Sequence, residues 1–442
     1  MDMIGFRIKP EMKLGVAVSA TQIEGGDRNN SWYDWYRKGK IKDNSSPERA
    51  NRHYELFRED TDLLKETLIQ TYRFGIEWSR IEPKPGEFRQ DVLNRYREEI
   101  SLLTEAGILP LLTLHHFTNP LWFEEMGGFE NPDSVPIFLR FTEKVVSSFG
   151  DLVSEYITVN EPNVYSVGGF FFGNWPPGKK SFRSVLKVYR HLTECHVKAY
   201  ELIHNIRKNK GYHDTKVGFA HHMRVFEPKN PNNPLHRLYA NCSEYLFQDV
   251  ICKAFMTGVC EFPLKKPKDI KPGKYYDFIG LNYYSRSTVS RFGDGVKGNV
   301  PVNDLGWEIY PQGILECAKK LYNQYSAPVY ITENGTCDNE DKFRSRFIYE
   351  HLKVLCESNL PVHRYYHWCF LDNFEWLEGE SARFGIVHVD FETQKRTVKK
   401  SGYFYREIIR NGGVSEEMAR ECLNEEYKIN DPKEKIIGGA WS

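Results

Sequence analysis

Two glutamates stand in short motifs whose residue types could carry acid–base or nucleophilic chemistry. Glu161 is followed by Pro162, and Glu333 is followed by an Asn-Gly pair. A carboxyl group can donate a proton when neutral and can attack or accept a proton when ionised, so two of them can divide these tasks. Each motif also has a structural interpretation, because Pro stops a strand and Asn-Gly favours a tight turn.

The elements that must position these glutamates alternate along most of the chain. Near-continuous apolar runs are typical of parallel strands covered on both faces, and amphipathic segments between them indicate helices. The expected strands are 13–20, 71–78, 108–116, 155–160, 216–223, 277–284, 328–333 and 361–370, and the expected helices include 48–67, 90–106, 134–149, 184–208, 311–325, 340–357 and 398–410. This pattern predicts an α/β fold, a (β/α)8 TIM barrel with its active site at the C-terminal ends of the strands.

The alternation is not interrupted by a Gly/Ser-rich or Pro-rich linker. We therefore expect a single catalytic domain over residues 1–410. Residues 411–442 are predicted to form a C-terminal extension that packs on the barrel or trails from it.

Polar side chains occur where most of the expected strands end. In a closed parallel barrel these ends line one mouth. The residues are Gln22, Glu24, Arg73, Glu77, His115, His116, Asn160, Glu161, Asn282, Tyr283, Tyr284, Glu333, Asn334, Trp368, Asp372 and Glu375. Burying so many polar groups without a purpose would cost free energy, so we interpret the ring as a site. Glu161 on the fourth strand and Glu333 on the seventh are expected to face each other across it.

Cleavage of a glycosidic bond uses a pair of carboxyl groups in this way. One protonates the leaving oxygen, and the other attacks the anomeric carbon or activates a water. A separation of about 5 Å retains the anomeric configuration, whereas roughly 6.5–9.5 Å inverts it. The strand positions indicate opposition of the two glutamates but leave the distance open.

Composition excludes several other function classes. Lys plus Arg and Asp plus Glu each number 60, so the formal net charge is zero and a dedicated nucleic-acid binder is not expected. No apolar run approaches the roughly 20 residues that span a bilayer. The N-terminal residues lack a signal-peptide pattern, and nine cysteines without a CxxC spacing favour reduced thiols, so we expect a cytoplasmic protein without membrane contact.

Cofactor chemistry is likewise not expected. The chain has no GxGxxG or P-loop pattern for a nucleotide, and His115-His116 lacks a third ligand at metal-binding spacing. Aromatic residues make up 14% of the chain; they can fill a core or stack on the apolar faces of sugar rings. We therefore predict no metal and no cofactor.

Five motifs closely resemble those of glycoside hydrolase family 1, the β-glucosidase family of retaining (β/α)8-barrel enzymes. They are QIEG at 22–25, TVNEP at 158–162, GLNYY at 280–284, ITENG at 331–335 and LDNFEW at 371–376. YRFGIEWSRIEP at 72–83, GWEIYPQG at 306–313 and RFGIVHVDF at 383–391 match as well. The resemblance extends from about Lys13 to Gly402, with all motifs in the family's order.

This resemblance implies roles for the two glutamates. Glu161 corresponds to the general acid/base and Glu333 to the nucleophile. Arg73 and Tyr284 match the positions that contact the nucleophile, where a cation and a phenol are expected to stabilise its anion and lower its pKa. Glu161 is expected to have no such cation, to start protonated, and to act as the base after Glu333 has been glycosylated.

The resemblance also implies a set of substrate-binding residues. Trp368 matches the aromatic floor of the sugar site, Asn160 the partner of the 2-hydroxyl, and Trp307 a position facing the leaving group. Asn282 is expected to support this network. The remaining positions that match the family's hydroxyl-binding set are Gln22, His116, Glu375 and Trp376.

Together these residues predict a retaining exo-β-glycosidase acting on a small β-glycoside or oligosaccharide, in the first place a β-glucosidase. Glu375 favours non-phosphorylated sugars, and the presence of Glu161 favours O-glycosides over thioglucosides. Phe117 and Asn119 depart from the family pattern and leave glucose, galactose, fucose and mannose open. Transglycosylation through the same intermediate and a non-catalytic sugar-binding barrel are the alternatives, and the oligomeric state is left open.

Overall fold

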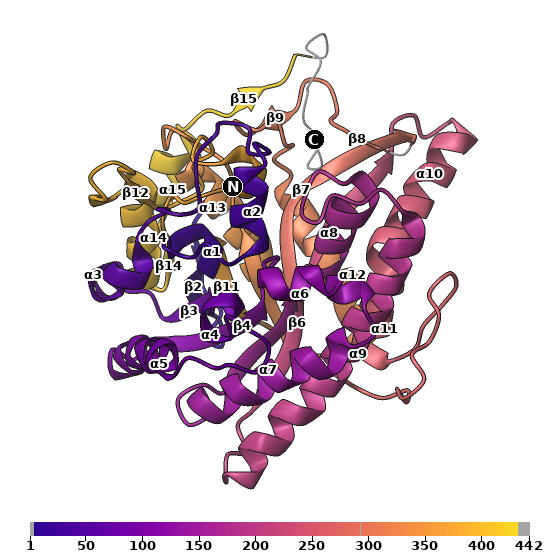
Figure 1. Ribbon diagram of the computed structural model, residues 1–442. Helices are drawn as coiled ribbons and strands as arrows, with labels where there is room; N and C mark the ends of the chain where they lie inside the picture. Colours follow the sequence, from indigo (N-terminus) through magenta and orange to yellow (C-terminus); the bar gives the residue numbers. More distant parts are fainter. Residues whose placement is uncertain (1–3, 292, 432–442) are drawn as a thin grey trace.

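A closed barrel of parallel strands forms the centre of the protein (Figure 1). The computed structural model describes residues 4–291 and 293–431. Within them, eight parallel strands follow the order β10-β11-β2-β3-β4-β5-β6-β7, and β7 pairs back with β10 to close the ring. Their bounds are β2 Lys13–Ala17, β3 Thr71–Gly75, β4 Leu109–His115, β5 Glu155–Asn160, β6 Lys216–Pro228, β7 Ile279–Arg291, β10 Val329–Asn334 and β11 Val362–Trp368. The predicted barrel is confirmed.

Helices surround the barrel, and those expected from the sequence are present. They are α3 His53–Glu66, α5 Gln90–Glu105, α7 Ser134–Phe149, α9 Phe182–Asn209, α12 Pro311–Tyr325, α13 Arg344–Cys356 and α14 Lys400–Asn411. Short helices occupy several loops: α1 Ala20–Ile23, α2 Ser31–Arg37, α4 Trp78–Ile81, α6 Leu121–Glu125 and α8 Pro162–Val167. The longer helices bury apolar stripes against the strands, which explains their periodic sequences.

One helical region between β6 and β7 was not expected from the sequence. It consists of α10 Pro234–Glu244, a π-helical turn over Tyr245–Asp249, and α11 Val250–Thr257. In α10 only Ala240 is buried, and Leu235 and Leu238 are exposed. Because this helix lacks a buried apolar stripe, its sequence carries little helical periodicity.

The interior of the barrel is filled with side chains below the C-terminal ends of the strands. Ala17, Leu111 and Ile157 from three strands pack there, and the rings of Phe278 and Tyr330 stack with centroids 4.2 Å apart. A packed interior leaves the mouth at the C-terminal strand ends as the place where a ligand can enter.

The C-terminal residues that the structure describes lie against the barrel. β14 (Gly413–Val414) pairs with β1 (Phe6–Arg7), and β15 (Lys428–Ile429) pairs with β9 (Pro301–Val302) at the top of the view in Figure 1. Part of the expected extension, 432–442, lies outside the described residues, and the boundary at residue 410 stays a prediction. In the described chain, no helix has the length and apolar character needed to cross a membrane.

Candidate active site

A pocket of about 280 Å³ opens at the C-terminal ends of the strands. Its volume is close to the lower end of the roughly 300–1,000 Å³ range of small-molecule sites. It brings together eight of the twelve site residues expected from the sequence: His116, Glu161, Tyr284, Trp307, Glu333, Trp368, Glu375 and Trp376. The other four, Gln22, Arg73, Asn160 and Asn282, are fully buried and bond to these residues or to one another.

Arg73 joins three strands beneath the pocket. Its Nη1 donates to Glu333 Oε1 over 2.5 Å and to the Thr332 carbonyl over 3.0 Å, and its Nη2 donates to Asn160 Oδ1 over 2.6 Å. The side chain points inward because side chains alternate along β3, and it is wholly buried. One guanidinium therefore fixes Glu333 on β10 relative to Asn160 on β5.

Each oxygen of Glu333 accepts a hydrogen bond from a group that stabilises a negative charge on the carboxylate. Oε1 faces Arg73, and Oε2 accepts from the Tyr284 hydroxyl over 2.6 Å. Charge-assisted hydrogen bonds of this kind are stronger than neutral ones. The contacts expected for Glu333 from the sequence are thus present.

Glu161 has different partners. Its Oε1 accepts from Asn282 Nδ2 over 2.8 Å and lies 3.0 Å from His222 Nδ1. Asn282 in turn accepts from the Thr332 hydroxyl and donates to Asn160, which links the two glutamates through uncharged amides. Glu161 makes no ion pair with an arginine or lysine among the described residues.

The pKa values of both glutamates are raised, which corrects one expectation. Burial raises the pKa of Glu333 to about 7, with Glu161 adding to the effect, although Arg73 and Tyr284 act to lower it. Burial likewise raises the pKa of Glu161 to about 7, while Asn282, Arg73 and Arg224 act to lower it. The expected lowering for Glu333 is therefore wrong: removal of the carboxyl from water outweighs the stabilising contacts.

Two nearby carboxyls with similar pKa values share protons as a pair. When the pair holds one proton, the ion pair with Arg73 favours the negative charge on Glu333, because Glu161 has only uncharged amide and imidazole contacts. The proton then resides on Glu161. This distribution suits a neutral acid opposite an ionised nucleophile.

The inner end of the pocket is built from aromatic rings and hydrogen-bonding groups. His116 packs between Trp368 and Trp376, with ring centroids at 5.7 and 5.9 Å. Gln22 Nε2 donates to Glu375 Oε2 over 3.2 Å, and the pKa of Glu375 is raised to about 8 by burial and by the charge of Glu333. Burial and Arg73 hold the pKa of His116 well below its usual range, so its ring is neutral. Flat faces beside polar groups suit a sugar ring.

Three non-glycine residues that line the pocket have left-handed backbone conformations. They are Phe117 with φ 67°, Glu161 with φ 42° and Trp376 with φ 48°. Side chains at such φ values are strained, and strain persists where the surrounding packing imposes it, which occurs often at active sites.

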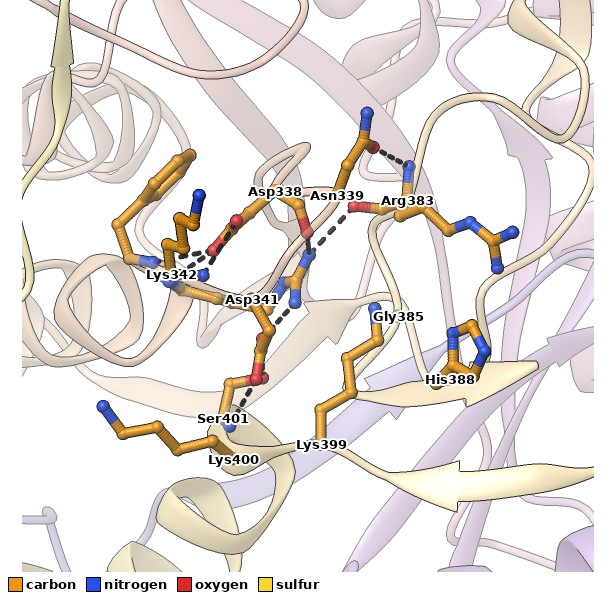
Figure 2. Close-up of polar contacts among 12 residues, drawn as sticks. Asp338, Asn339, Asp341, Lys342, Arg383, Gly385, His388, Lys399, Lys400 and Ser401 are labelled. Atoms are coloured by element: carbon orange, nitrogen blue, oxygen red, sulfur yellow. Dashed lines mark hydrogen bonds and ion pairs between the residues drawn. The ribbon is translucent and has the colours of Figure 1, made fainter. Parts of the chain in front are cut away.

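A polar cluster around the buried Arg344 holds the loop that follows Glu333 (Figure 2). Arg344 pairs with Asp341 and donates to the carbonyl oxygens of Asp338 and Arg383 over 2.6 and 2.9 Å. The Arg383 N–H donates to Asn339 Oδ1 over 2.9 Å. This cluster ties the loop after β10 to the segment that carries Phe384, a pocket-lining residue.

Two residues close to Glu161 were not predicted from the sequence. His222 contacts Glu161 directly, and Arg224 contacts His222; both line the pocket from β6. A signal was present, since His221-His222 lies one residue before the end of the fifth expected strand, 216–223, and His115-His116 ends the third. His115 itself is buried and bonds to Asn119 Oδ1 over 2.9 Å. Among the described residues, no group of three or more His, Cys, Asp or Glu is arranged to hold a metal ion.

The sequence is similar to those of known glycoside hydrolases. Residues 8–414 match the sequence profile described as glycosyl hydrolase family 1. The chain is 31% identical to beta-glucosidase A of Thermotoga maritima, covering 91% of this chain and 97% of that protein. It is 29% identical to a beta-galactosidase of Pyrococcus woesei, over 94% of this chain and 99% of that protein.

A solved structure gives the same result in three dimensions. The fold superposes on a beta-glycosidase from Pyrococcus horikoshii with a TM-score of 0.85 at 34% identity, covering 94% of this chain and 98% of that one. The family match and the barrel fold agree. The chain belongs to glycosyl hydrolase family 1 and is a glycoside hydrolase.

Proposed function

We propose that this enzyme is a retaining exo-β-glycosidase that hydrolyses non-phosphorylated β-glucosides, with Glu333 as nucleophile and Glu161 as acid/base. The observation that carries the proposal is the asymmetry of the two carboxyls. Glu333 is bound by Arg73 and Tyr284, whereas Glu161 is bound by Asn282 and His222. The names of the relatives, a beta-glucosidase and a beta-galactosidase, support the substrate class.

The reaction proceeds in two displacements at the anomeric carbon. Glu333 attacks this carbon while Glu161 gives its proton to the glycosidic oxygen, so the aglycone leaves as an alcohol. Glu161, now ionised, takes a proton from water, and the resulting hydroxide equivalent attacks the same carbon and releases Glu333. Two inversions give net retention.

The sugar is held at the inner end of the pocket. Trp368 supplies an apolar floor, and Gln22, His116, Glu375 and Trp376 offer partners for its hydroxyl groups. Asn160 stands next to Glu161, where its amide suits the 2-hydroxyl. The ring centroid of Trp307 lies 6.0 Å from that of Tyr284, and Trp307 faces the side where the aglycone leaves. An acceptor alcohol bound on that side would give transglycosylation from the same intermediate.

Two features of the pocket narrow the range of sugars that we expect it to accept. Glu375 places a carboxyl group where a sugar phosphate would need cations, so 6-phosphosugars fit poorly. Phe117 lines the pocket, whereas Asn119 donates to Glu124 and Tyr165 in a buried network. The choice between glucose and its epimers therefore depends on Phe117 more than on Asn119.

All nine cysteines carry free thiols, which supports the cytoplasm as the compartment.

A panel of 4-nitrophenyl β-glycosides that differ only in the sugar tests this proposal. We expect kcat/KM to be highest for the glucoside or to be shared with the galactoside and fucoside, and to be lower by at least about 100-fold for the 6-phosphoglucoside. NMR of the fresh product should show the β-anomer of the sugar first. Initial release of the α-anomer would overturn the retaining mechanism, and no hydrolysis of any member would overturn the activity.

A further inference from the structure

His222 and Arg224 stand next to Glu161 on the inward side of β6. His222 Nδ1 lies 3.0 Å from Glu161 Oε1, and its Nε2 lies 3.1 Å from Arg224 Nη2. Both side chains are buried, and the His222 ring also stacks on Tyr284, with centroids 6.1 Å apart and planes inclined by 16°. The imidazole thus lies between Glu161 and the tyrosine that bonds to Glu333.

Arg224 fixes the tautomer of His222. A guanidinium group only donates hydrogen bonds, so the imidazole nitrogen facing it must accept. Nε2 therefore carries the lone pair, and Nδ1 carries the proton and donates it towards Glu161. A second proton on Nε2 would bring two donors and two positive charges together, so the ring remains neutral.

The Glu161 carboxyl is oriented as a result. Both of its hydrogen bonds to described side chains, from His222 and from Asn282, reach Oε1. An oxygen that accepts two N–H groups has no lone pair left to carry an acid proton directed at a substrate. In the neutral acid, the proton therefore resides on Oε2.

We propose that His222 is a positioning residue for the acid/base Glu161, held as an Nδ1–H donor by Arg224, so that the acid proton is presented from Oε2 to the leaving group. This rests on the proposed role of Glu161. The same two donors to Oε1 persist when Glu161 ionises, so the carboxylate keeps its orientation as it activates water in the second displacement.

Leaving-group dependence separates this role from a purely structural one. Phenyl β-glucoside needs an acid to leave, whereas 2,4-dinitrophenyl β-glucoside does not, and kcat/KM reports the first displacement for both. In His222→Phe we expect kcat/KM to fall about 10- to 100-fold for the phenyl glucoside and to change less than about 3-fold for the dinitrophenyl glucoside. Equal losses on both substrates would overturn the proposal.

The conservative variant His222→Asn tests whether a hydrogen-bond donor at this position is sufficient to restore activity. In His222→Asn the side-chain amide nitrogen can occupy nearly the place of Nδ1 and donate to Oε1. We expect His222→Asn to recover most of the phenyl glucoside activity lost in His222→Phe. If Asn is as defective as Phe, donation to Oε1 is not what His222 contributes.

Arg224 is tested through its coupling to His222. Arg224→Met frees the imidazole to change its tautomer or to become charged, so the loss on the phenyl glucoside should reappear. In the His222→Asn background the same change should have little effect, because an amide needs no partner to fix a tautomer. Additive losses in the double variant would contradict an action of Arg224 through His222.

Two controls complete the experiment. His221→Asn makes the same substitution one residue earlier, where the ring packs on Phe219 away from Glu161, and it should show no difference between the two substrates. Glu161→Ala must itself lose far more activity on the phenyl than on the dinitrophenyl glucoside. If it does not, the proposed role of Glu161 fails; if it does and His222→Phe does not, only the positioning role fails.

Discussion

Arg73 Nη1 lies 2.5 Å from Glu333 Oε1, and both side chains are buried. The other terminal nitrogen of the same guanidinium binds Asn160, the residue before Glu161. Burial raises the pKa of both glutamates, so the location of the charge within the pair depends on this ion pair.

Azide should distinguish the two glutamates by the product it forms. Glu161→Ala should lower kcat/KM for phenyl β-glucoside about 10²- to 10⁴-fold, and azide should raise turnover of the dinitrophenyl glucoside by attacking the glycosyl-enzyme without a base. The product is then the β-glycosyl azide. In Glu333→Ala azide takes the place of the missing nucleophile and should give the α-glycosyl azide. The opposite pair of products, identified by NMR, would reverse the assignment.

Tyr284→Phe removes the hydroxyl that donates to Glu333 Oε2. A hydrogen bond to a charged group contributes about 1.5–3 kcal/mol, so kcat should fall roughly 10- to 100-fold. The pKa of Glu333 should rise further, which moves the acidic limb of kcat/KM to higher pH. Tyr283→Phe is the matched control, because its hydroxyl bonds to the Tyr310 carbonyl away from the site. An unchanged acidic limb in Tyr284→Phe would contradict the contact's role.

The pH dependence of kcat/KM should be a narrow bell centred near pH 7. The pKa values of Glu161 and Glu333 are both raised to about 7 by burial, and the active form of the pair holds one proton. As the pH falls below this region, Glu333 gains a proton and the nucleophile is lost. As the pH rises above it, Glu161 loses its proton and the acid is lost. A broad plateau from pH 5 to 9 would contradict the shared proton.

Stability should depend on pH through a buried network remote from the pocket. His53 lies 2.8 Å from Asp60 and 2.9 Å from Glu99, and although burial acts to lower its pKa, Glu99 and Asp60 raise it to about 9. Because the folded-state pKa lies above the unfolded value, this stabilisation is complete below about pH 6.5 and is lost as the pH rises through about 9. It amounts to up to about 3 kcal/mol.

Urea unfolding of the wild type and of His53→Gln checks this expectation. The free energy of unfolding of the wild type should decrease between pH 6.5 and 9.5 more steeply than that of the variant. Parallel decreases in the two proteins would show that His53 is not charged in the folded state.

The barrel was predictable because its strands are short apolar runs that recur with helices between them. Burial on both faces imposes that composition, so the sequence of β4 or β5 indicates a strand without its neighbours. The region of α10 and α11 was missed because Ala240 is the one buried residue of α10, and a helix with one buried residue has no apolar stripe.

The site was predictable in its contacts and less so in its electrostatics. Arg73 and Tyr284 reach Glu333 as the motifs indicated, because strand ends in a parallel barrel converge. The direction of the Glu333 pKa shift was wrong, since the loss of hydration depends on packing from the whole barrel. His222 and Arg224 were missed because two residues on one strand reveal a role only when Glu161 is seen beside them.

Trapping of the glycosyl-enzyme tests the central claim most directly. 2,4-Dinitrophenyl 2-deoxy-2-fluoro-β-glucoside reacts with a nucleophile and then turns over slowly, so the covalent intermediate accumulates. We predict one sugar per protein molecule by mass spectrometry, carried on the peptide that contains Glu333, and no labelling of Glu333→Gln. A label on the peptide with Glu161, or steady release of dinitrophenol without any labelled protein, would contradict Glu333 as the nucleophile.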